Sequence, residues 1–257
     1  MPYSLKLLLI GLLTIPTCFI ILLLAPFDHY GKLGYSISRF WASALLKLSG
    51  IRLRVQGLEK LDSTRHYIFI ANHQSYIDIP ALVHALPLFQ LRWIAKKEIL
   101  WVPLFGWVLW TTKHIIVDRS NLSKAMTSLR KARDRIKKGI SVVVFPEGTR
   151  SRHGKLLPFK RGGFLLAIKT QTPIVPITIN GSGTILPRED WRVRSGEIEV
   201  VVSEPVPIDP VHSEKLKPLL TRVRAEMETH LLRRADSSGS ESNSPVALLP
   251  AQNWGEV

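Results

Sequence analysis

The sequence predicts an α/β fold, a single domain with a central mixed or parallel sheet flanked by helices, preceded by an N-terminal membrane-binding helical element. Short β-branched or apolar runs alternate along the chain with helical patterns, the order typical of a sheet covered by helices. The chain has 257 residues, enough for one domain with a substantial core. With 46% apolar and 21% charged residues, most of it is expected to be globular.

The chain begins with a long apolar segment. Residues 7–27, LLLIGLLTIPTCFIILLLAPF, lie between Lys6 and Asp28 and contain no charge. At about 1.5 Å per residue, a helix of this length can cross a hydrocarbon core of about 30 Å. A cleaved signal peptide fits poorly, because Lys6 is the only basic residue before the run and a proline stands where cleavage would fall. A soluble core helix would be less apolar, so we expect a retained membrane anchor, spanning or embedded from one side.

Residues 32–49 predict a second helix of different character. Apolar residues recur at helical spacing among Lys32, Arg39 and Lys47, and Gly50 is a stop signal. This helix is either interfacial, with aromatic rings at the lipid headgroups, or an amphipathic cover for the soluble core. Since basic residues follow the apolar run closely, the positive-inside bias predicts an inner or cytoplasmic membrane location, with the bulk of the chain facing the cytoplasm. Residues 1–50 are therefore the predicted anchor and interfacial helix.

The remaining elements follow in order. IRLRVQG at 51–57 alternates with period two and predicts a half-exposed strand, whereas ISVVVF at 140–145 predicts a buried one. Pro176 within IVPITI predicts an edge strand or a bulge. The predicted strands are 51–57, 67–71, 92–95, 114–117, 140–145, 174–179 and 197–203, and the predicted helices are 80–86, 121–138 and 213–233. The Ser-rich residues 235–257 predict a disordered tail.

Charge and cysteine content limit the function classes. Lys and Arg number 35 and Asp and Glu 20, a net charge of +15, which favours an anionic partner such as phosphate groups, an acidic carrier protein, anionic lipid or nucleic acid. The single cysteine, Cys18, excludes an internal disulfide scaffold and multi-cysteine metal centres. No recognisable nucleic-acid-binding motif accompanies the charge, so no nucleic-acid partner is expected.

The first polar cluster, NHQSYID at 72–78, directly follows a predicted buried strand. His73 and Asp78 are five residues apart, about 140° around a regular helix, so they meet only if the chain turns between them. Pro80 favours a helix start nearby, with Asp78 in its first turn. The carboxylate would then fix the imidazole tautomer and leave the other ring nitrogen as a general base. A histidine that merely caps a loop is the alternative interpretation.

Two elements of other catalytic sites are missing around His73. The sequence contains no G-x-S-x-G motif and no cysteine near a predicted helix start, so the nucleophile is expected to be a substrate hydroxyl. His73 also has no ligand partners at metal-site spacing, and no metal is expected.

The second cluster, FPEGTRS at 145–151, also follows a predicted core strand. Gly148 lets the backbone approach a ligand, Thr149 offers a hydroxyl, and the planar guanidinium of Arg150 suits a phosphate group. Glu147 can orient the arginine or bind a substrate hydroxyl. The spacing is not that of a Walker A loop. A solvated turn with ordinary surface charge is the alternative.

Lys96 and Arg119, each just past a predicted strand, are further candidates for holding a phosphate or an oxyanion.

The two clusters together resemble the glycerolipid acyltransferase family, the 1-acyl-glycerol-3-phosphate acyltransferases in particular. The stretches AKKEILWVPLFGW, VDR, PFKRGG and IVPITI match in order, so the resemblance covers residues 51–183. It implies that His73 and Asp78 are the catalytic H-x4-D pair and that Glu147, Gly148, Thr149 and Arg150 bind the glycerol phosphate. It also implies an acyltransferase domain at 51–234, with its motif core at 67–183, behind a membrane-binding N-terminus.

The activity that the resemblance implies is direct acyl transfer. A fatty acyl group would pass from acyl-CoA or acyl-acyl-carrier-protein, as co-substrate, to the sn-2 hydroxyl of 1-acyl-glycerol-3-phosphate, giving phosphatidic acid in phospholipid biosynthesis. No cofactor is expected, and the partners are membrane lipid, a lysophospholipid acceptor and the thioester donor, with acyl carrier protein as one possible donor form. Another acceptor (glycerol-3-phosphate, another lysophospholipid or a lyso-aminolipid) or a membrane thioesterase-like hydrolase are the alternatives.

Overall fold

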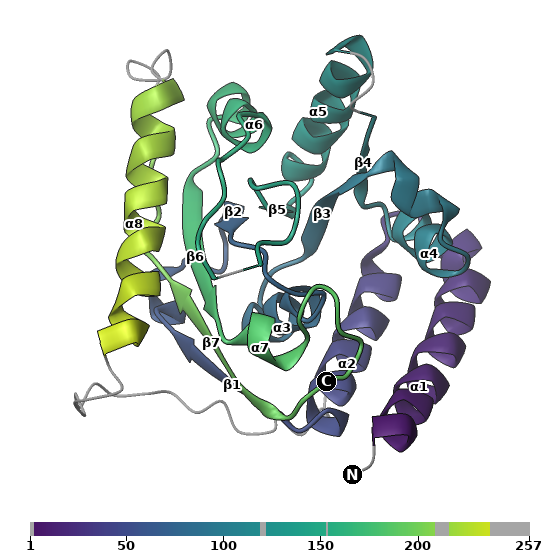
Figure 1. Cartoon of the computed structure of the whole chain (residues 1–257). Coiled ribbons are helices and arrows are strands. Elements are labelled where there is room, and N and C mark those ends of the chain that lie inside the picture. The colour runs from purple at the N-terminus through teal and green to yellow at the C-terminus, as the bar shows by residue number, and fades with distance from the viewer. Residues whose placement is uncertain (1–2, 119–121, 153, 209–215, 237–257) are drawn as a thin grey trace.

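The computed structural model of the chain describes residues 3–118, 122–152, 154–208 and 216–236. It is built on one seven-stranded sheet with helices on both faces (Figure 1), so the predicted α/β fold is confirmed. Apart from residues 235 and 236, the predicted tail at 235–257 lies outside the described residues. Arg119 lies outside them too.

The sheet is mixed. Its order is β1-β7-β6-β2-β5-β3-β4, with β6, β2, β5, β3 and β4 parallel to one another and β7 and β1 running the opposite way. The strands are β1 (Ile51–Gln56), β2 (Ile68–Ala71), β3 (Leu91–Lys96), β4 (Ile115–Val117), β5 (Ser141–Val144), β6 (Ile174–Asn180) and β7 (Gly196–Val202). All seven predicted strands are present, with small differences in their ends.

Alternating residues of the central strands enter two separate cores. Phe69 and Ala71 pack with the helices on one face, whereas Ile68 and Ile70 pack with those on the other. This alternation is the period-two pattern of a strand that is buried on both sides. The first face is covered by α2 (Lys32–Leu48), α3 (Asp78–Ala85) and α7 (Ser182–Ile185), and the second by α5 (Leu122–Ile136), α6 (Gly162–Thr170) and α8 (Leu216–Asp236).

Of the two alternatives predicted for Pro176, an edge strand or a bulge, the structure shows the bulge. Strand β6 lies inside the sheet, between β7 and β2. The segment that pairs with β6 is irregular beside the proline. Ile177 pairs with Val202 and Ile174 pairs with Val206, so this segment has one residue more between the two pairs than β6 has. Ser203 N–H donates to Pro176 O at 3.0 Å. The extra residue makes this a bulge, which accommodates a residue without an N–H in an interior strand.

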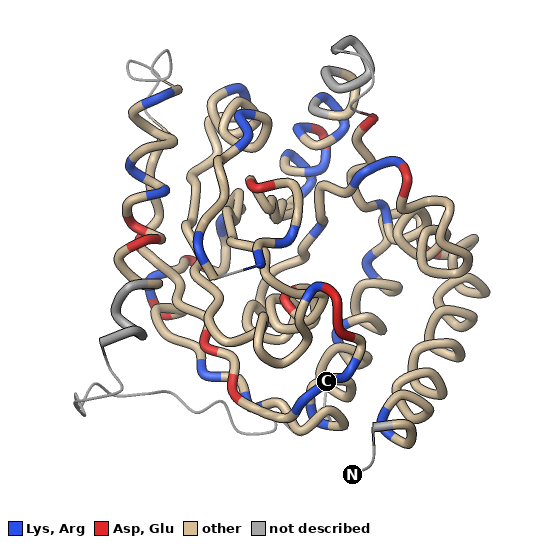
Figure 2. Tube along the Cα trace, viewed as in Figure 1, with Lys and Arg blue, Asp and Glu red and all other residues tan. Residues whose placement is uncertain are grey.

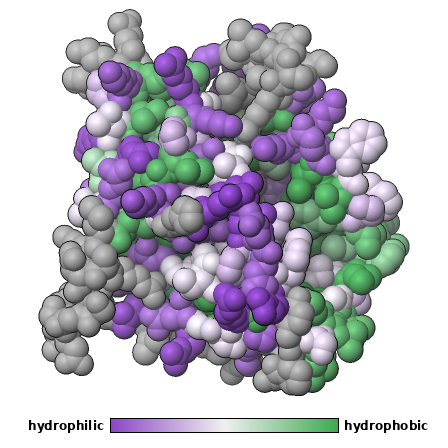
Figure 3. All heavy atoms as spheres, viewed as in Figure 1, coloured by the Kyte–Doolittle hydropathy of each residue, from purple (hydrophilic) through white to green (hydrophobic). Residues whose placement is uncertain are grey.

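The N-terminal helix lies alongside the domain. Helix α1 (Tyr3–Leu24), continued by a 3-10 turn at Ala25–Phe27, packs against α2 and against α4 (Phe105–Thr111). Among the described residues it is the one helix long and apolar enough to cross a membrane. Only 17% of the residues in its apolar stretch are buried inside the structure. Apolar residues gather on the side of the molecule where α1 lies (Figure 3).

Two buried cations hold this helix to the domain. Near its start, Lys6 Nζ donates to Ser49 O at 3.0 Å and to Val193 O at 3.1 Å. At its far end, Arg92 on β3 donates to Gly31 O at 2.8 Å in the turn between α1 and α2. Burial lowers the pKa of Arg92 to about 10, so the guanidinium stays charged at neutral pH. Helix α1 is therefore fixed at both ends.

Candidate active site

The loops that follow β2 and β5 form one site. These strands are parallel neighbours, so both loops leave the same edge of the sheet, where ligands bind in open α/β folds. The first loop carries residues 72–78 and the second carries residues 145–151. Ser151 N–H donates to His73 O at 2.8 Å and ties the loops together. The two clusters found in the sequence therefore meet in space.

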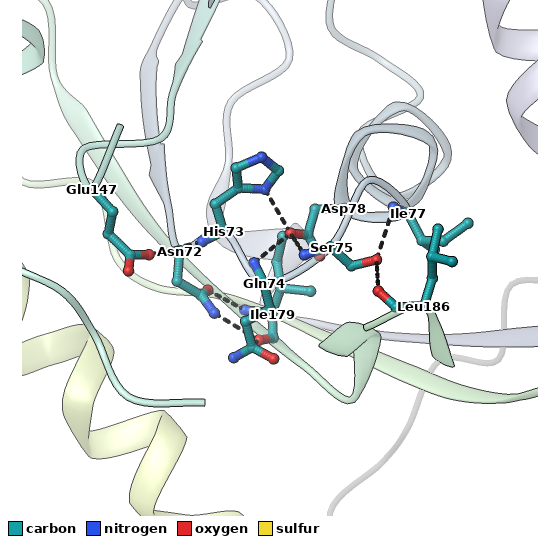
Figure 4. Close-up of polar contacts among 9 residues, drawn as sticks. All are labelled: Asn72, His73, Gln74, Ser75, Ile77, Asp78, Glu147, Ile179 and Leu186. Carbon is teal, nitrogen blue, oxygen red and sulfur yellow. Dashed lines mark hydrogen bonds and ion pairs between the residues drawn. The ribbon is translucent and has the colours of Figure 1, made fainter. Parts of the chain in front are cut away.

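His73 and Asp78 face each other across the first loop (Figure 4). His73 Nδ1–H donates to Asp78 Oδ2 at 2.8 Å, and Asp78 is the first residue of α3. The chain turns between them, as the sequence spacing requires. The side chain of Asp78 is fully buried, whereas that of His73 keeps 15% of its surface exposed. With Nδ1 bonded to the carboxylate, Nε2 is the nitrogen left to accept a proton.

The Asp78 carboxylate is held by its own loop. Besides His73, its Oδ2 accepts the Gln74 N–H at 2.7 Å and the Ser75 N–H at 2.8 Å. One oxygen thus collects three hydrogen bonds, which close the loop and set the plane of the imidazole. The carboxylate is a positioning group for His73.

Phe145, the first residue after β5, supports the imidazole from its face. The rings of His73 and Phe145 stack with centroids 4.0 Å apart and planes 12° from parallel. The contact prevents the imidazole from rotating away from Asp78. Phe145 stood within the second cluster, but the sequence offered no signal for this role.

Glu147 joins the two loops through their backbones. Its Oε1 accepts the His73 N–H at 2.9 Å, and its Oε2 accepts the Leu157 N–H at 2.9 Å. The residue is 3% exposed, and burial raises the pKa of Glu147, an effect that these two hydrogen bonds partly oppose. Both oxygens are thus engaged inside the protein, and the predicted contact of Glu147 with a substrate stays a prediction.

Two further residues of the first loop anchor it, Asn72 to β6 and Ser75 to the residue that follows α7, as Figure 4 shows. Asn72 donates through Nδ2 to Ile179 O at 2.8 Å and accepts the Ile179 N–H at 2.7 Å, so its amide replaces a strand partner beside β6. Ser75 Oγ donates to Leu186 O at 2.8 Å. Sequence reasoning missed both anchors, because their partners lie more than 100 residues away in the chain.

The second loop presents Gly148, Thr149 and Arg150 to the same space as His73. Gly148 has φ +69°, a left-handed conformation that favours glycine and turns the backbone toward the cavity. The Arg150 guanidinium lies over the ring of Tyr76, 3.7 Å from its centroid. The predicted phosphate-binding residues are therefore adjacent to the predicted base.

Lys96, the last residue of β3, lines this cavity too, because β3 is the neighbour of β5 on the other side. Arg119 lies outside the described residues, so its predicted role stays a prediction. Within the described ranges, no three His, Cys, Asp or Glu side chains gather closely enough to hold a metal ion.

A large apolar cavity extends from His73 and Arg150 to the N-terminal helices. Its volume is about 830 Å³. Its walls come from α1, α2, α3 and the segment 99–109, and most of its surface is apolar; examples are Ile10, Ile21, Trp41, Val83 and Val108. His73 and Arg150 both line this cavity, whereas Asp78 is buried behind His73. The arrangement can present a polar headgroup to His73 while an attached hydrocarbon chain stays out of water.

The chain is similar to known acyltransferases. The family model described as Acyltransferase matches residues 52–180. A 1-acyl-sn-glycerol-3-phosphate acyltransferase of Cocos nucifera is 38% identical over 188 residues, 73% of this chain and 60% of that protein. The alpha form from Homo sapiens is 36% identical, over 71% of this chain and 64% of that protein. A Limnanthes douglasii enzyme of the same name is 35% identical, over 74% and 67%. The match spans less than two thirds of the first two relatives.

The crystal structure of the 1-acyl-sn-glycerophosphate acyltransferase PlsC from Thermotoga maritima has the same fold. The two chains superpose with a TM-score of 0.74, covering 94% of this chain and all of the other, at 24% sequence identity.

Proposed function

Since the chain belongs to the acyltransferase family, we propose that it transfers a fatty acyl group from an acyl thioester to the sn-2 hydroxyl of 1-acyl-glycerol-3-phosphate, giving phosphatidic acid. The observation that carries the proposal is that His73, bonded to Asp78 at 2.8 Å, lines the same apolar cavity as Arg150. A base, a phosphate ligand and space for a hydrocarbon chain are what this reaction requires.

His73 acts as the general base. Its Nε2 removes the proton from the acceptor hydroxyl as that oxygen attacks the thioester carbonyl carbon. The tetrahedral intermediate then collapses, the carbon–sulfur bond breaks, and the thiolate takes the proton from the imidazolium. Asp78 stabilises the imidazolium that forms and holds the ring in place. No acyl-enzyme is formed, and no cofactor takes part.

The acceptor phosphate binds at Arg150. Thr149 and the backbone at Gly148 lie beside the guanidinium and can donate further hydrogen bonds. Lys96, which lines the cavity on the β3 side, stabilises the oxyanion of the intermediate. We retain Arg119 as a second candidate for this role because in the sequence it stands just past a predicted strand.

The acyl chains occupy the apolar cavity. Residues of α1 and α2, among them Ile10, Ile21 and Trp41, line it together with residues of the α/β domain, so the N-terminal helices complete the substrate site as well as bind the membrane. A hydrocarbon chain here exchanges water for apolar contacts at roughly 0.8 kcal/mol per buried CH₂ group.

The outer face of α1 binds the membrane. Leu8, Leu12, Phe19 and Leu23 are all more than half exposed along it. The exposed apolar surface continues onto the segment around α4 through Trp101, Trp107 and Trp110, and tryptophan is enriched at membrane interfaces.

Because α1 is fixed at both ends to the domain, we propose that it is embedded from one side rather than projecting across the bilayer. The catalytic domain then faces the cytoplasm, where acyl-CoA and acyl-acyl-carrier-protein are available. Both donors are anionic and suit the positive charge of the chain.

The test is acyl transfer by the purified full chain in detergent or vesicles. Acyl-CoA and acyl-acyl-carrier-protein are supplied in turn with a panel of acceptors: 1-acyl-glycerol-3-phosphate, glycerol-3-phosphate, lysophosphatidylcholine, a lyso-aminolipid, and none. Product formation with the first acceptor well above the others is the expected result. Preference for another acceptor would overturn the acceptor assignment, and thiol release that needs no acceptor would identify a thioesterase instead.

A further inference from the structure

Three side chains from three different segments form a stack at the mouth of the site. The Arg150 guanidinium lies over one face of the Tyr76 ring, 3.7 Å from its centroid. Tyr76 in turn stacks with Trp191, with ring centroids 6.0 Å apart and planes 23° from parallel. Tyr76 belongs to the His73 loop, Arg150 follows β5, and Trp191 lies in the connection between α7 and β7.

This stack holds the guanidinium without using its N–H groups. A cation over an aromatic face is attracted by the ring, and the N–H donors of a stacked guanidinium lie in its own plane. Tyr76 and Trp191 are 46% and 67% exposed, so the stack is open to an incoming ligand. Arg150 is therefore oriented in advance, with its hydrogen-bond donors available to an anion.

A second arginine lies beside the first. Arg188, also in the α7–β7 connection, donates through Nη1 to the backbone carbonyl of Arg150 at 3.2 Å. Arg188 lines the same cavity as His73 and Arg150. Basic and acidic residues both occur along this connection (Figure 2). An arginine here can attract an anionic ligand only if no carboxylate already neutralises its charge.

The acidic residues of this connection are paired with other arginines. Glu189 forms an ion pair with Arg152 at 2.7 Å. Asp190 forms ion pairs with two neighbours, Arg192 at 3.0 Å and Arg194 at 2.9 Å.

Arg150 and Arg188 have no carboxylate partner among the residues that the structure describes. The charged residues lining the cavity are Lys96, Arg150 and Arg188 against Glu98 alone. Two arginines that line one cavity without a carboxylate partner, one of them bonded to the backbone of the other, suit a doubly charged anion.

We propose that Arg188 is a second ligand of the acceptor phosphate, and that the Tyr76–Trp191 stack positions Arg150 as the first. The proposal rests on the proposed function, since it assigns further residues to the acceptor headgroup. A phosphate monoester carries up to two negative charges and three terminal oxygens, which suits two guanidinium groups better than one.

The test for Arg188 compares two arginines of one connection. Arg188→Ala should raise KM for 1-acyl-glycerol-3-phosphate by roughly ten- to hundredfold with kcat less affected, because a charge-assisted contact is lost. Arg194→Ala, an exposed arginine paired with Asp190, is the matched control and should leave KM unchanged. Monoacylglycerol, which has the same chain and no phosphate, is tested with both variants. Its slow acylation should not respond to Arg188→Ala.

Tyr76 is tested by Tyr76→Ala against Tyr76→Phe. The phenylalanine keeps the ring and should keep KM near the wild-type value, whereas alanine should raise KM roughly tenfold because the guanidinium is no longer held. An equal loss in both variants would show that the ring face is not what matters.

The outcomes separate the two levels of the proposal. If the wild-type chain acylates 1-acyl-glycerol-3-phosphate but Arg188→Ala has the KM of Arg194→Ala, this inference is wrong and the proposed function stands. The inference is also overturned if Arg188→Ala loses as much activity on monoacylglycerol as on 1-acyl-glycerol-3-phosphate, since such a loss would be structural. If the wild-type chain acylates no acceptor, the proposed function itself fails.

Discussion

At the scale of single residues, Glu147 shows how one buried side chain can serve two loops. Its two oxygens accept the backbone N–H groups of His73 and Leu157, so it fixes the proposed base and the chain after the second loop at once. The sequence suggested that Glu147 orients the arginine or binds a substrate hydroxyl, and the family resemblance implied that it binds the glycerol phosphate. The position of a buried acceptor cannot be read from spacing, since its partners are backbone groups that every residue has.

Glu147→Ala should therefore reduce kcat more than it raises KM. Removing the carboxylate leaves two N–H groups unpaired, each at a cost of about 1–3 kcal/mol, and lets the His73 loop move. Glu147→Gln keeps one acceptor oxygen and should lose less. Steady-state kinetics with varied acceptor decide the matter: a raised KM with normal kcat would show that Glu147 binds the substrate after all.

His114 predicts a pH dependence of stability. Burial, with Arg92 nearby, holds the pKa of His114 well below its usual value of about 6.5. The unfolded chain then binds more protons than the folded chain below that value, so stability falls as pH falls through about 6.5 and keeps falling toward pH 5. One such group contributes at most about 1.4 kcal/mol per pH unit.

His114→Asn should make that decline shallower. The asparagine oxygen can replace Nδ1 as acceptor of the Trp93 N–H, which lies 3.0 Å from it, but does not titrate. His84, whose pKa burial also lowers, retains part of the slope. Thermal unfolding from pH 7 to 5 measures the effect, with His66→Asn as the control. A slope unchanged by His114→Asn would contradict the assignment.

At the scale of elements, all seven strands were predicted from the sequence, but helix α6, which begins with two glycines, was not. The β-branched run of β5 and the amphipathic face of α5 were recognisable because periodicity alone defines them. Helix α6 was missed because Gly162 and Gly163 read as a loop. In the structure, a Cβ on Gly163 would lie 2.9 Å from Val144 Cγ1, so the glycine allows α6 to approach the sheet. That requirement exists only in three dimensions.

The two glycines should therefore respond in opposite ways. Gly163→Val should destabilise the protein by about 1–3 kcal/mol, because the new side chain meets Val144 and Ile70 in a packed core. Gly162→Ala, whose Cβ would meet nothing within 4 Å, should be neutral or stabilise by up to about 1 kcal/mol. Unfolding temperatures of both variants check this; equal effects would mean that α6 does not pack as described.

At the scale of the whole molecule, charge and apolar surface are separated. Beyond Lys6 the N-terminal helix carries no charge, whereas basic residues are spread over the rest of the chain (Figure 2), which has a net charge of +15. The proposed membrane association therefore has two sources, the apolar helix and the net positive charge of the chain, and these respond differently to salt.

Binding to anionic vesicles should weaken several-fold between about 0.05 and 0.5 M salt, because screening removes the electrostatic part. Binding to zwitterionic vesicles should change little, since the apolar face is unaffected. Cosedimentation with both vesicle types measures the difference. Salt-independent binding to anionic vesicles would show that the positive charge has no part in membrane association.

The whole site was predictable in outline and not in detail. Loops after neighbouring parallel strands meet, so the sequence was sufficient to bring His73, Asp78 and Arg150 together once the strands were recognised. Phe145 under the imidazole, the Asn72 anchor and Arg188 were not predictable, because each depends on a partner distant in the chain or on ring geometry.

We expect His73, held by Asp78, to be the base for acyl transfer. The most direct measurement is kcat for acylation of 1-acyl-glycerol-3-phosphate by His73→Ala beside the wild-type chain, with the unfolding temperature of each recorded. Loss of the base should lower kcat by about 10²- to 10⁴-fold while the protein remains folded, since the imidazole contributes to catalysis and little to packing. A folded His73→Ala variant with kcat near the wild-type value would contradict the account.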